Sequence, residues 1–258
     1  MERKFVALTI EERIAVVTIN HPPINALDPQ LTKELSETFD ILKNREDFGV
    51  VILTAQGKAF VAGADIRVFL ELDRKKGEEY ALAVTDMQRK IEEFGRPVIA
   101  AINGYALGGG CELAMACDIR IASSSARFGQ PEASLGVIPG AGGTQRLPRL
   151  VPLGRAKELL FTGDRISASE AERIGLVDHV VPEGEELDQA KQTARKILKN
   201  APVAVRFIKK AVNRGLQMSL NDALMMEATL FGELFETQDV REGVNAFLEK
   251  REGDFKGK

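Results

Sequence analysis

The chain opens with two short runs of apolar and β-branched residues. Residues 5–10 and 14–19 flank the polar triplet 11–13, a pattern that predicts two strands joined as a hairpin. Farther on, Asp28 precedes Pro29, the order expected of a helix N-cap followed by a first-turn proline. Apolar residues then recur at helical spacing up to Leu42. We therefore predict a helix of about four turns after the hairpin.

Strand and helix patterns alternate through the middle of the chain. Residues 50–53 form a continuous apolar run, which is typical of a strand buried on both faces. The sequence indicates later strands over 98–102, 119–122 and 177–181, helices over 78–94 and 111–116, and a glycine-rich turn over 140–144 before another helix. From about residue 187 the pattern is helical, with Phe231, Leu234, Phe235 and Phe247 spaced for packing on a partner surface. The alternation predicts an α/β fold whose helical tail docks on the core or builds an oligomer.

Length and composition narrow the possible classes of protein. With 258 residues, 44% hydrophobic and 28% charged, the chain fits one large α/β domain or one with a smaller helical appendage. The net charge of −3, with both signs interspersed, disfavours nucleic acid and anionic membranes as partners. Residues 1–5 lack the apolar core of a secretory signal, and no run approaches the roughly 18 apolar residues of a membrane span. We expect a cytoplasmic protein that does not bind a membrane.

Several kinds of catalytic site are disfavoured by the motifs. The sequence has no dinucleotide or nucleotide glycine motif, no zinc-protease motif and no nucleophile elbow. Cys111 and Cys117, the only cysteines, lie in an apolar stretch and are expected to be buried thiols, not metal ligands or a disulfide. His21 and His179 are the only histidines, and His21 sits in a proline-rich turn, which disfavours a histidine-centred triad.

A glycine cluster leads into a helix that carries one carboxyl group. Residues 101–115 read AINGYALGGGCELAM, with Glu112 in the first turn of the expected helix. Helix N-termini present unpaired N–H groups, and glycines let a ligand approach the backbone. Gly109 is therefore a candidate donor to an oxyanion. Alternatively, the glycines serve only tight packing of the helix on the sheet, and Glu112 only complements the helix dipole.

Two further segments are candidates for the same site. Glu132 follows Glu112 by twenty residues, enough for a helix, a strand and a return turn, so both carboxyl groups could face one cavity. Alternatively, Glu132 is a loop residue in a salt bridge. Residues 58–66, KAFVAGADI, form a small-residue turn after the strand at 50–53, and the backbone amides of this turn are a second possible carbonyl or anion site.

Four of these segments resemble the motifs of the crotonase (enoyl-CoA hydratase/isomerase) family. They are residues 62–66, 103–115, 128–132 and 139–147, and they occur in the family's order. The resemblance continues through LFTGDRI at 160–166 and REG at 241–243 and covers most of the chain from about Phe5 onward.

The resemblance implies a fold and a division of the chain. The fold would be a crotonase-like spiral of ββα units over residues 1–195, which holds the active site. Residues 196–258 would form a C-terminal helical region that mediates trimers, often paired into hexamers, and covers the active site.

The resemblance also implies the site residues. The N–H groups of Ala64 and Gly109 would form an oxyanion hole for the thioester carbonyl. Glu112 would orient and activate water, and Glu132 would handle the proton exchanged with C2. Residues matching the family's substrate and coenzyme A contacts are Ala62, Ala64, Asp65, Ile66, Gly109 and Lys250. For Lys250 a solvated surface lysine is an equal alternative.

The implied activity is that of an enoyl-CoA hydratase, a lyase that reversibly converts trans-2-enoyl-CoA to 3-hydroxyacyl-CoA in fatty-acid metabolism such as β-oxidation. No metal or other cofactor is expected, because the thioester supplies the activation. The presence of both glutamates favours hydration over a 3,2-enoyl-CoA isomerase or another crotonase-fold acyl-CoA enzyme, because double-bond migration can work with one acid/base group. A non-catalytic binding protein, for example one that binds RNA, is the alternative of another class. Acyl chain length and pathway stay open.

Overall fold

The computed structural model describes residues 3–258. Met1 and Glu2, the first residues of the predicted spiral region 1–195, lie outside the described residues. The larger of its two sheets begins with the predicted hairpin, an antiparallel pair of strands. From the second strand onward the neighbours are parallel, in the order β1-β2-β3-β5-β7-β10. These strands are β1 (Val6–Glu11), β2 (Ile14–Ile19), β3 (Val50–Ala55), β5 (Val98–Ile102), β7 (Ile119–Ser123) and β10 (His179–Val181).

A second, four-stranded sheet has the order β4-β6-β8-β9. Its strands are β4 (Ala59–Val61), β6 (Tyr105–Leu107), β8 (Arg127–Gly129) and β9 (Arg165–Ser167). The segment that we predicted as a turn at 58–66 therefore contains a strand. Each of these strands has three residues, too few to show the alternation that marks a strand in sequence.

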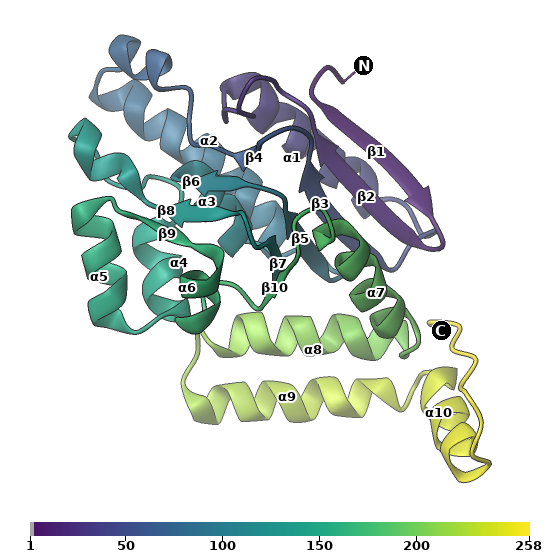
Figure 1. The fold of residues 1–258 in the computed structure, drawn as a ribbon. Helices are drawn as coiled ribbons and strands as arrows, with labels where there is room; N and C mark the ends of the chain where they lie inside the picture. The colour runs from purple at the N-terminus through teal and green to yellow at the C-terminus, as the bar shows by residue number, and fades with distance from the viewer. Residues whose placement is uncertain (1–2) are drawn as a thin grey trace.

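The two sheets are built by a repeating unit. β3 lies in the large sheet, β4 in the small one, and helix α2 (Arg74–Glu92) follows; β5, β6 and α3 (Gly109–Met115) repeat the order. β7 and β8 begin a third unit, which continues through the short helix η2 (Pro131–Leu135), α4 (Gly143–Leu150) and α5 (Leu153–Thr162). Figure 1 shows these units winding side by side. The predicted spiral of ββα units is confirmed.

Capping side chains explain where two of the helices begin. Asp28 caps α1 (Pro29–Lys43) by accepting the N–H of Leu31 at 2.7 Å, as predicted. α2 begins at Arg74, four residues before the predicted start, because Asp73 accepts the N–H of Lys76 at 2.9 Å.

The remaining boundaries differ in smaller ways. α3 begins at the glycines, at Gly109, two residues before its predicted start. The strand predicted over 177–181 is reduced to β10, because the Val177 N–H instead bonds to the carbonyl of Ala171 (3.1 Å) at the end of α6 (Ala168–Arg173).

The large sheet is buried on both faces. Leu53 and Val51 of β3 belong to the main core together with Leu35 of α1 and Met87 of α2. Ile52, on the opposite face of β3, packs in a second cluster with residues of α7 (Glu186–Leu198). Every residue of β3 is buried, as its continuous apolar run predicts.

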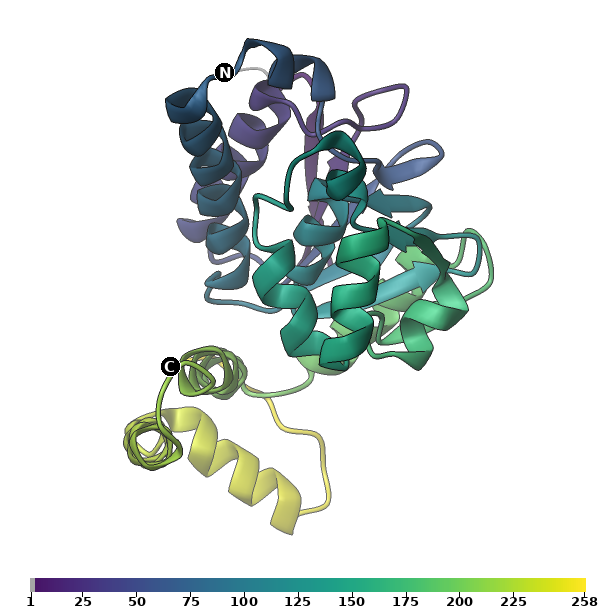
Figure 2. The ribbon, with the colours of Figure 1, turned by 90° about the vertical axis from the view of Figure 1, so that its left-hand side faces the viewer.

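The C-terminal helices extend away from the sheets. They are α8 (Pro202–Gly215), α9 (Leu220–Leu234) and α10 (Gln238–Leu248), and both ribbon views show α9 and α10 beyond α8 on the side away from the sheets (Figure 1, Figure 2). The expected division at residues 195 and 196 falls within α7, which packs on the sheet, and it stays a prediction. Within residues 3–258, no helix combines the length and apolarity needed to cross a lipid bilayer.

Candidate active site

Glu112 lies on the short helix α3 and points into the protein. Glu112 is 2% exposed. Its Oε1 accepts hydrogen bonds from the peptide N–H groups of Ala141 (2.9 Å) and Gly143 (2.7 Å). Burial raises the pKa of this carboxyl group, while the two N–H donors and the nearby Arg146 guanidinium oppose that rise. The paired N–H donors favour the ionised form at Oε1, and Oε2 accepts no hydrogen bond from residues 3–258.

Glu132 lies in η2 and has a different environment. Burial raises its pKa to about 7, and repulsion from the Glu112 charge adds to that rise. With its amide oriented so that Nε2 faces Glu132, the buried Gln130 donates to both carboxyl oxygens at 3.1 and 3.2 Å. Both protonation states of Glu132 are therefore accessible near neutral pH.

Two glycines lie between the carboxyl groups. A Cβ atom built on Gly108 would lie 2.5 Å from Oε1 of Glu132, and one built on Gly109 would lie 3.9 Å from Oε2 of Glu112. Gly108 also has a φ of +50°, which glycine adopts without the steric cost of a side chain. The structure thus brings Glu112 and Glu132 together beside one dipeptide.

The same place holds two open peptide N–H groups. Gly109 is the first residue of α3, so its N–H has no partner within the helix. Ala64 forms a bridge with Leu27 in which the neighbouring peptides, of Gly63 and Asp65, make the hydrogen bonds. Among residues 3–258, no acceptor pairs with the N–H of Ala64 or of Gly109. Both groups are available to a carbonyl oxygen.

Close backbone contact sets the start of α3 against β4. A Cβ atom on Gly110 would lie 1.9 Å from the carbonyl oxygen of Val61, so only glycine fits there. One on Gly63 would lie 3.7 Å from the carbonyl oxygen of Leu107. The loop after β4, which carries Ala64, therefore lies beside the strand that leads into α3.

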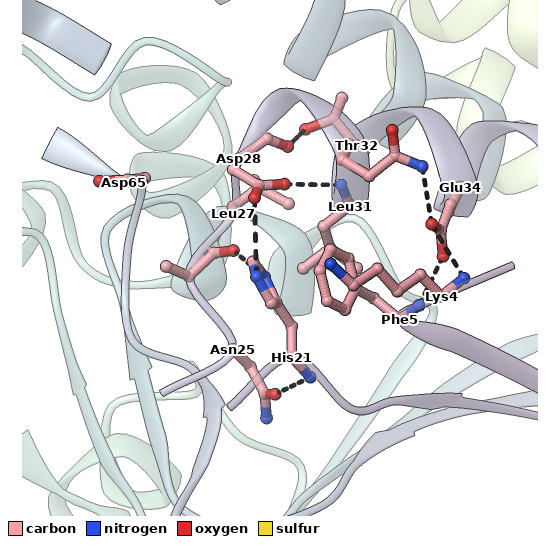
Figure 3. A network of polar contacts seen from close by, with 12 residues as sticks. Lys4, Phe5, His21, Asn25, Leu27, Asp28, Leu31, Thr32, Glu34 and Asp65 are labelled. Carbon is pink, nitrogen blue, oxygen red and sulfur yellow. Dashed lines mark hydrogen bonds and ion pairs between the residues drawn. The ribbon is translucent and has the colours of Figure 1, made fainter. Parts of the chain in front are cut away.

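A polar network fixes the turn that carries Leu27 (Figure 3). Asn25 accepts the His21 N–H at 2.6 Å, and Nδ1 of His21 lies 3.1 Å from the carbonyl oxygen of Ala26. Nε2 of His21 lies 3.6 Å from the carboxylate of Asp28. Through these contacts His21 helps to hold the turn in which Leu27 forms the β-bridge with Ala64.

Of the residues expected to contact coenzyme A, some lie at this site and Lys250 lies elsewhere. Ala62 donates its N–H to the carbonyl oxygen of Ile24, Asp65 caps the short helix η1 (Ile66–Glu71), and Ile66 is 51% exposed. An ion pair with Arg67 at 2.7 Å holds the pKa of Asp65 below its usual value. Lys250 is exposed just after α10, a helix that both ribbon views place away from α3 (Figure 1, Figure 2). Its role stays a prediction.

Sequence reasoning missed the groups that hold the two carboxyls. Ala141 and Gly143 donate to Glu112, and Gln130 donates to Glu132. The glycine-rich turn at 140–144 was recognised in the sequence, but nothing in its letters indicates that its peptide groups face Glu112.

Comparison with known proteins relates this arrangement to a family. The family model described as enoyl-CoA hydratase/isomerase matches residues 9–258. The chain is 51% identical to the short-chain-enoyl-CoA hydratase of Clostridium acetobutylicum and 48% identical to the crotonyl-CoA hydratase of Syntrophomonas wolfei, with 97% of each chain covered in both cases. The crystal structure of an enoyl-CoA hydratase from Bacillus anthracis superposes with a TM-score of 0.95 at 41% identity, over 99% of this chain and 100% of that one.

Proposed function

The chain belongs to the enoyl-CoA hydratase/isomerase family, and we propose that it hydrates short-chain trans-2-enoyl-CoA thioesters to 3-hydroxyacyl-CoA. The observation that carries this proposal is the pair of neighbouring glutamates in contrasting environments. One accepts two peptide N–H groups, and the other has a pKa of about 7. The relatives named for short-chain and crotonyl-CoA hydration support the reaction and the chain length.

The thioester carbonyl oxygen would bind between the N–H groups of Ala64 and Gly109. Attack of water on C3 moves negative charge onto that oxygen, and fixed donors stabilise the charge more than they stabilise the uncharged substrate. In other oxyanion holes the loss of one donor costs on the order of 3 kcal/mol. Because the thioester itself accepts the charge, we propose that no metal or redox cofactor takes part.

The two carboxyl groups would divide the proton transfers. In this proposal Oε2 of Glu112 orients the water and accepts its proton as the C3–O bond forms. Protonated Glu132 gives its proton to C2, and exchange with solvent then restores the pair. Its pKa of about 7 suits this donor, because a general acid works best with a pKa near the working pH.

The C-terminal helices would build an oligomer. α9 has only one buried residue, Leu230, and exposes apolar side chains that include Phe231 and Met225. Exposed apolar area of this kind marks contact surfaces. We propose that these helices pack on neighbouring copies in a trimer or a pair of trimers. Active-site cover by residues 196–258, a cytoplasmic location and a place in β-oxidation remain predictions from the sequence.

The test is loss of enoyl absorbance when the purified protein meets crotonyl-CoA, beside the variants Glu112→Gln and Glu132→Gln. We expect turnover by the wild type and a loss of at least about a hundredfold in each variant, because each removes an acid/base group. Glu12→Gln, on the exposed β1–β2 turn, is the control and should keep full activity.

Other outcomes would point to the other candidate functions. Migration of a 3,4 double bond without hydration would identify an isomerase. A folded protein that turns over neither crotonyl-CoA nor a longer enoyl-CoA, and that binds RNA in a salt-dependent way, would be a binding protein.

A further inference from the structure

The position of the Glu112 carboxylate depends on a turn with little stiffness of its own. Ala141 and Gly143, whose N–H groups bind Oε1, flank Gly142, and Gly140 precedes them. Gly142 has a φ of +104°. Glycines lose the most conformational freedom on folding, so a turn with three of them needs contacts from elsewhere to stay fixed.

Arg146 supplies such contacts. Its Nη1 donates to the carbonyl oxygen of Ala141 at 2.8 Å, the residue whose N–H binds Glu112. A Cβ atom on Gly142 would lie 2.2 Å from the same nitrogen, so the guanidinium occupies the place of a side chain at that position. The Arg146 side chain is only 13% exposed, so these contacts are largely shielded from water.

The other side of the guanidinium is bound to α2. Its Nη2 donates to Oε2 of Glu92 at 2.8 Å, its Nε reaches Oε1 of Glu92 at 3.4 Å, and Nη1 reaches Gln88 at 3.1 Å. Gln88 is fully buried and donates in turn to the carbonyl oxygen of Gly109 at 3.4 Å. One planar cation thus ties the Glu112-binding turn to α2 and, through Gln88, to the start of α3.

We propose that Arg146 is a positioning residue, which holds the turn at Ala141 to Gly143 so that two peptide N–H groups keep the Glu112 carboxyl group in place. The proposal rests on the hydration function proposed above. Arg146 acts through the turn and takes no proton itself. The Glu92 carboxylate and the Gln88 amide fix its plane.

The expected result for Arg146→Gln is a kcat lower by at least about tenfold, with KM within about twofold, because the acid/base group is misplaced while the thioester contacts remain. Arg146→Lys should recover part of kcat, since an ammonium group can bind one acceptor but cannot bridge Ala141, Gln88 and Glu92 as the guanidinium does. Arg149→Gln, one turn away on an exposed face of α4, is the matched control and should behave as wild type.

The pH dependence of kcat/KM separates positioning from mere stability. The ionisable groups near Glu112 are Arg146 on α4, Glu132 in η2, Tyr80 on α2 and Cys111 on its own helix. Loss of Arg146 removes a positive charge and loosens two N–H donors, so the pKa of Glu112 rises. The acid limb of the profile should therefore move to higher pH.

A folded Arg146→Gln protein with wild-type kcat and an unmoved acid limb would overturn the proposal. Where that variant does not fold, Glu92→Gln takes its place, because it weakens the fork without removing the guanidinium. A drop of about twofold or more in kcat is then expected, and an unchanged kcat overturns the proposal. If the wild type itself hydrates no enoyl-CoA, the proposed function fails instead.

Discussion

At the scale of single residues, the candidate site places one type of side chain in two different environments. Glu112 is buried and Glu132 half-buried, and only Glu112 accepts two short peptide hydrogen bonds. Burial without such donors leaves the pKa of Glu132 at about 7. Main-chain donors supplied by α4 and the turn before it therefore oppose the rise in pKa that burial causes at Glu112.

Glu132 should make the fold less stable as the pH rises. Its pKa is about 7 in the folded protein against 4.5 when unperturbed, so its favourable contribution is complete below about pH 4.5 and lost as the pH passes 7. Glu132→Gln removes the charge. We expect a variant that unfolds like the wild type at pH 4 and is more stable at pH 8, by up to about 3 kcal/mol.

Thermal unfolding followed by circular dichroism across this pH range provides the check. A difference between the two proteins that stays constant from pH 4 to pH 8 would contradict the raised pKa. The same variant should lose hydration activity. Glu132 would then serve the reaction while lowering the stability of the fold at pH 8.

At the scale of elements, α8 is held to the core by a buried ion pair. Lys209 donates to Asp118 at 2.7 Å and to the carbonyl oxygen of Arg96 at 3.2 Å, and its side chain is 8% exposed. The same Asp118 carboxylate accepts the N–H of Val98 at the start of β5. One side chain of α8 thereby reaches the amino end of the parallel sheet.

Lys209→Ala should release α8 and destabilise the protein by roughly 3 kcal/mol, because the Asp118 carboxylate would lose its cation while still buried. Lys210→Ala, on the neighbouring exposed position, is the control. Hydrogen exchange measured by mass spectrometry is the readout. Equal exchange of the α8 amides in Lys209→Ala and wild type would refute this anchoring role.

Elements with a strong local signal were predictable, and those built by distant pairing were not. The β1–β2 hairpin, β3 and α1 followed from hydrophobic period and from the Asp28 cap. The second sheet did not, because each of its strands has three residues and pairs only with strands far along the chain. The residue pattern alone therefore did not indicate the contact that sets Ala64 beside α3; only the family resemblance implied it.

For the candidate site, the sequence indicated residues and not their electrostatics. The glycine-rich motifs singled out Glu112 and Glu132, and the structure brings the two together. The opposition to the rise in the pKa of Glu112 comes from Ala141 and Gly143, whose contacts are made by peptide groups. Peptide groups are the same at every residue, so sequence carries no sign of them.

At the scale of the whole molecule, the C-terminal helices leave a large apolar surface outside the core. The exposed apolar side chains of α8 to α10 and their connections include Ile208, Leu216, Leu220, Met225, Phe231, Phe235, Phe247 and Leu248. A surface of this extent on a single chain is unfavourable in water. It is the part of the molecule on which the proposed oligomer depends.

Phe231→Glu should disrupt that oligomer. Phe231 of α9 is 64% exposed and packs edge-on against Phe235, the residue after the helix. A charge at position 231 would be buried without a partner in any assembly through this face. Light scattering after size-exclusion chromatography gives the mass. We expect an oligomeric wild type and a smaller species for the variant, whereas Ile41→Glu on α1 should leave the mass unchanged. A variant with wild-type mass would exclude this face.

The open N–H groups of Ala64 and Gly109 differ in how easily a mutation can remove them. A peptide N–H is deleted only by proline, and a glycine codon needs two base changes to become a proline codon, whereas an alanine codon needs one. A mutational screen limited to single-base changes can therefore remove the donor at position 64 but not the one at 109. Few inactive clones at position 109 would then reflect the genetic code, and not a dispensable group.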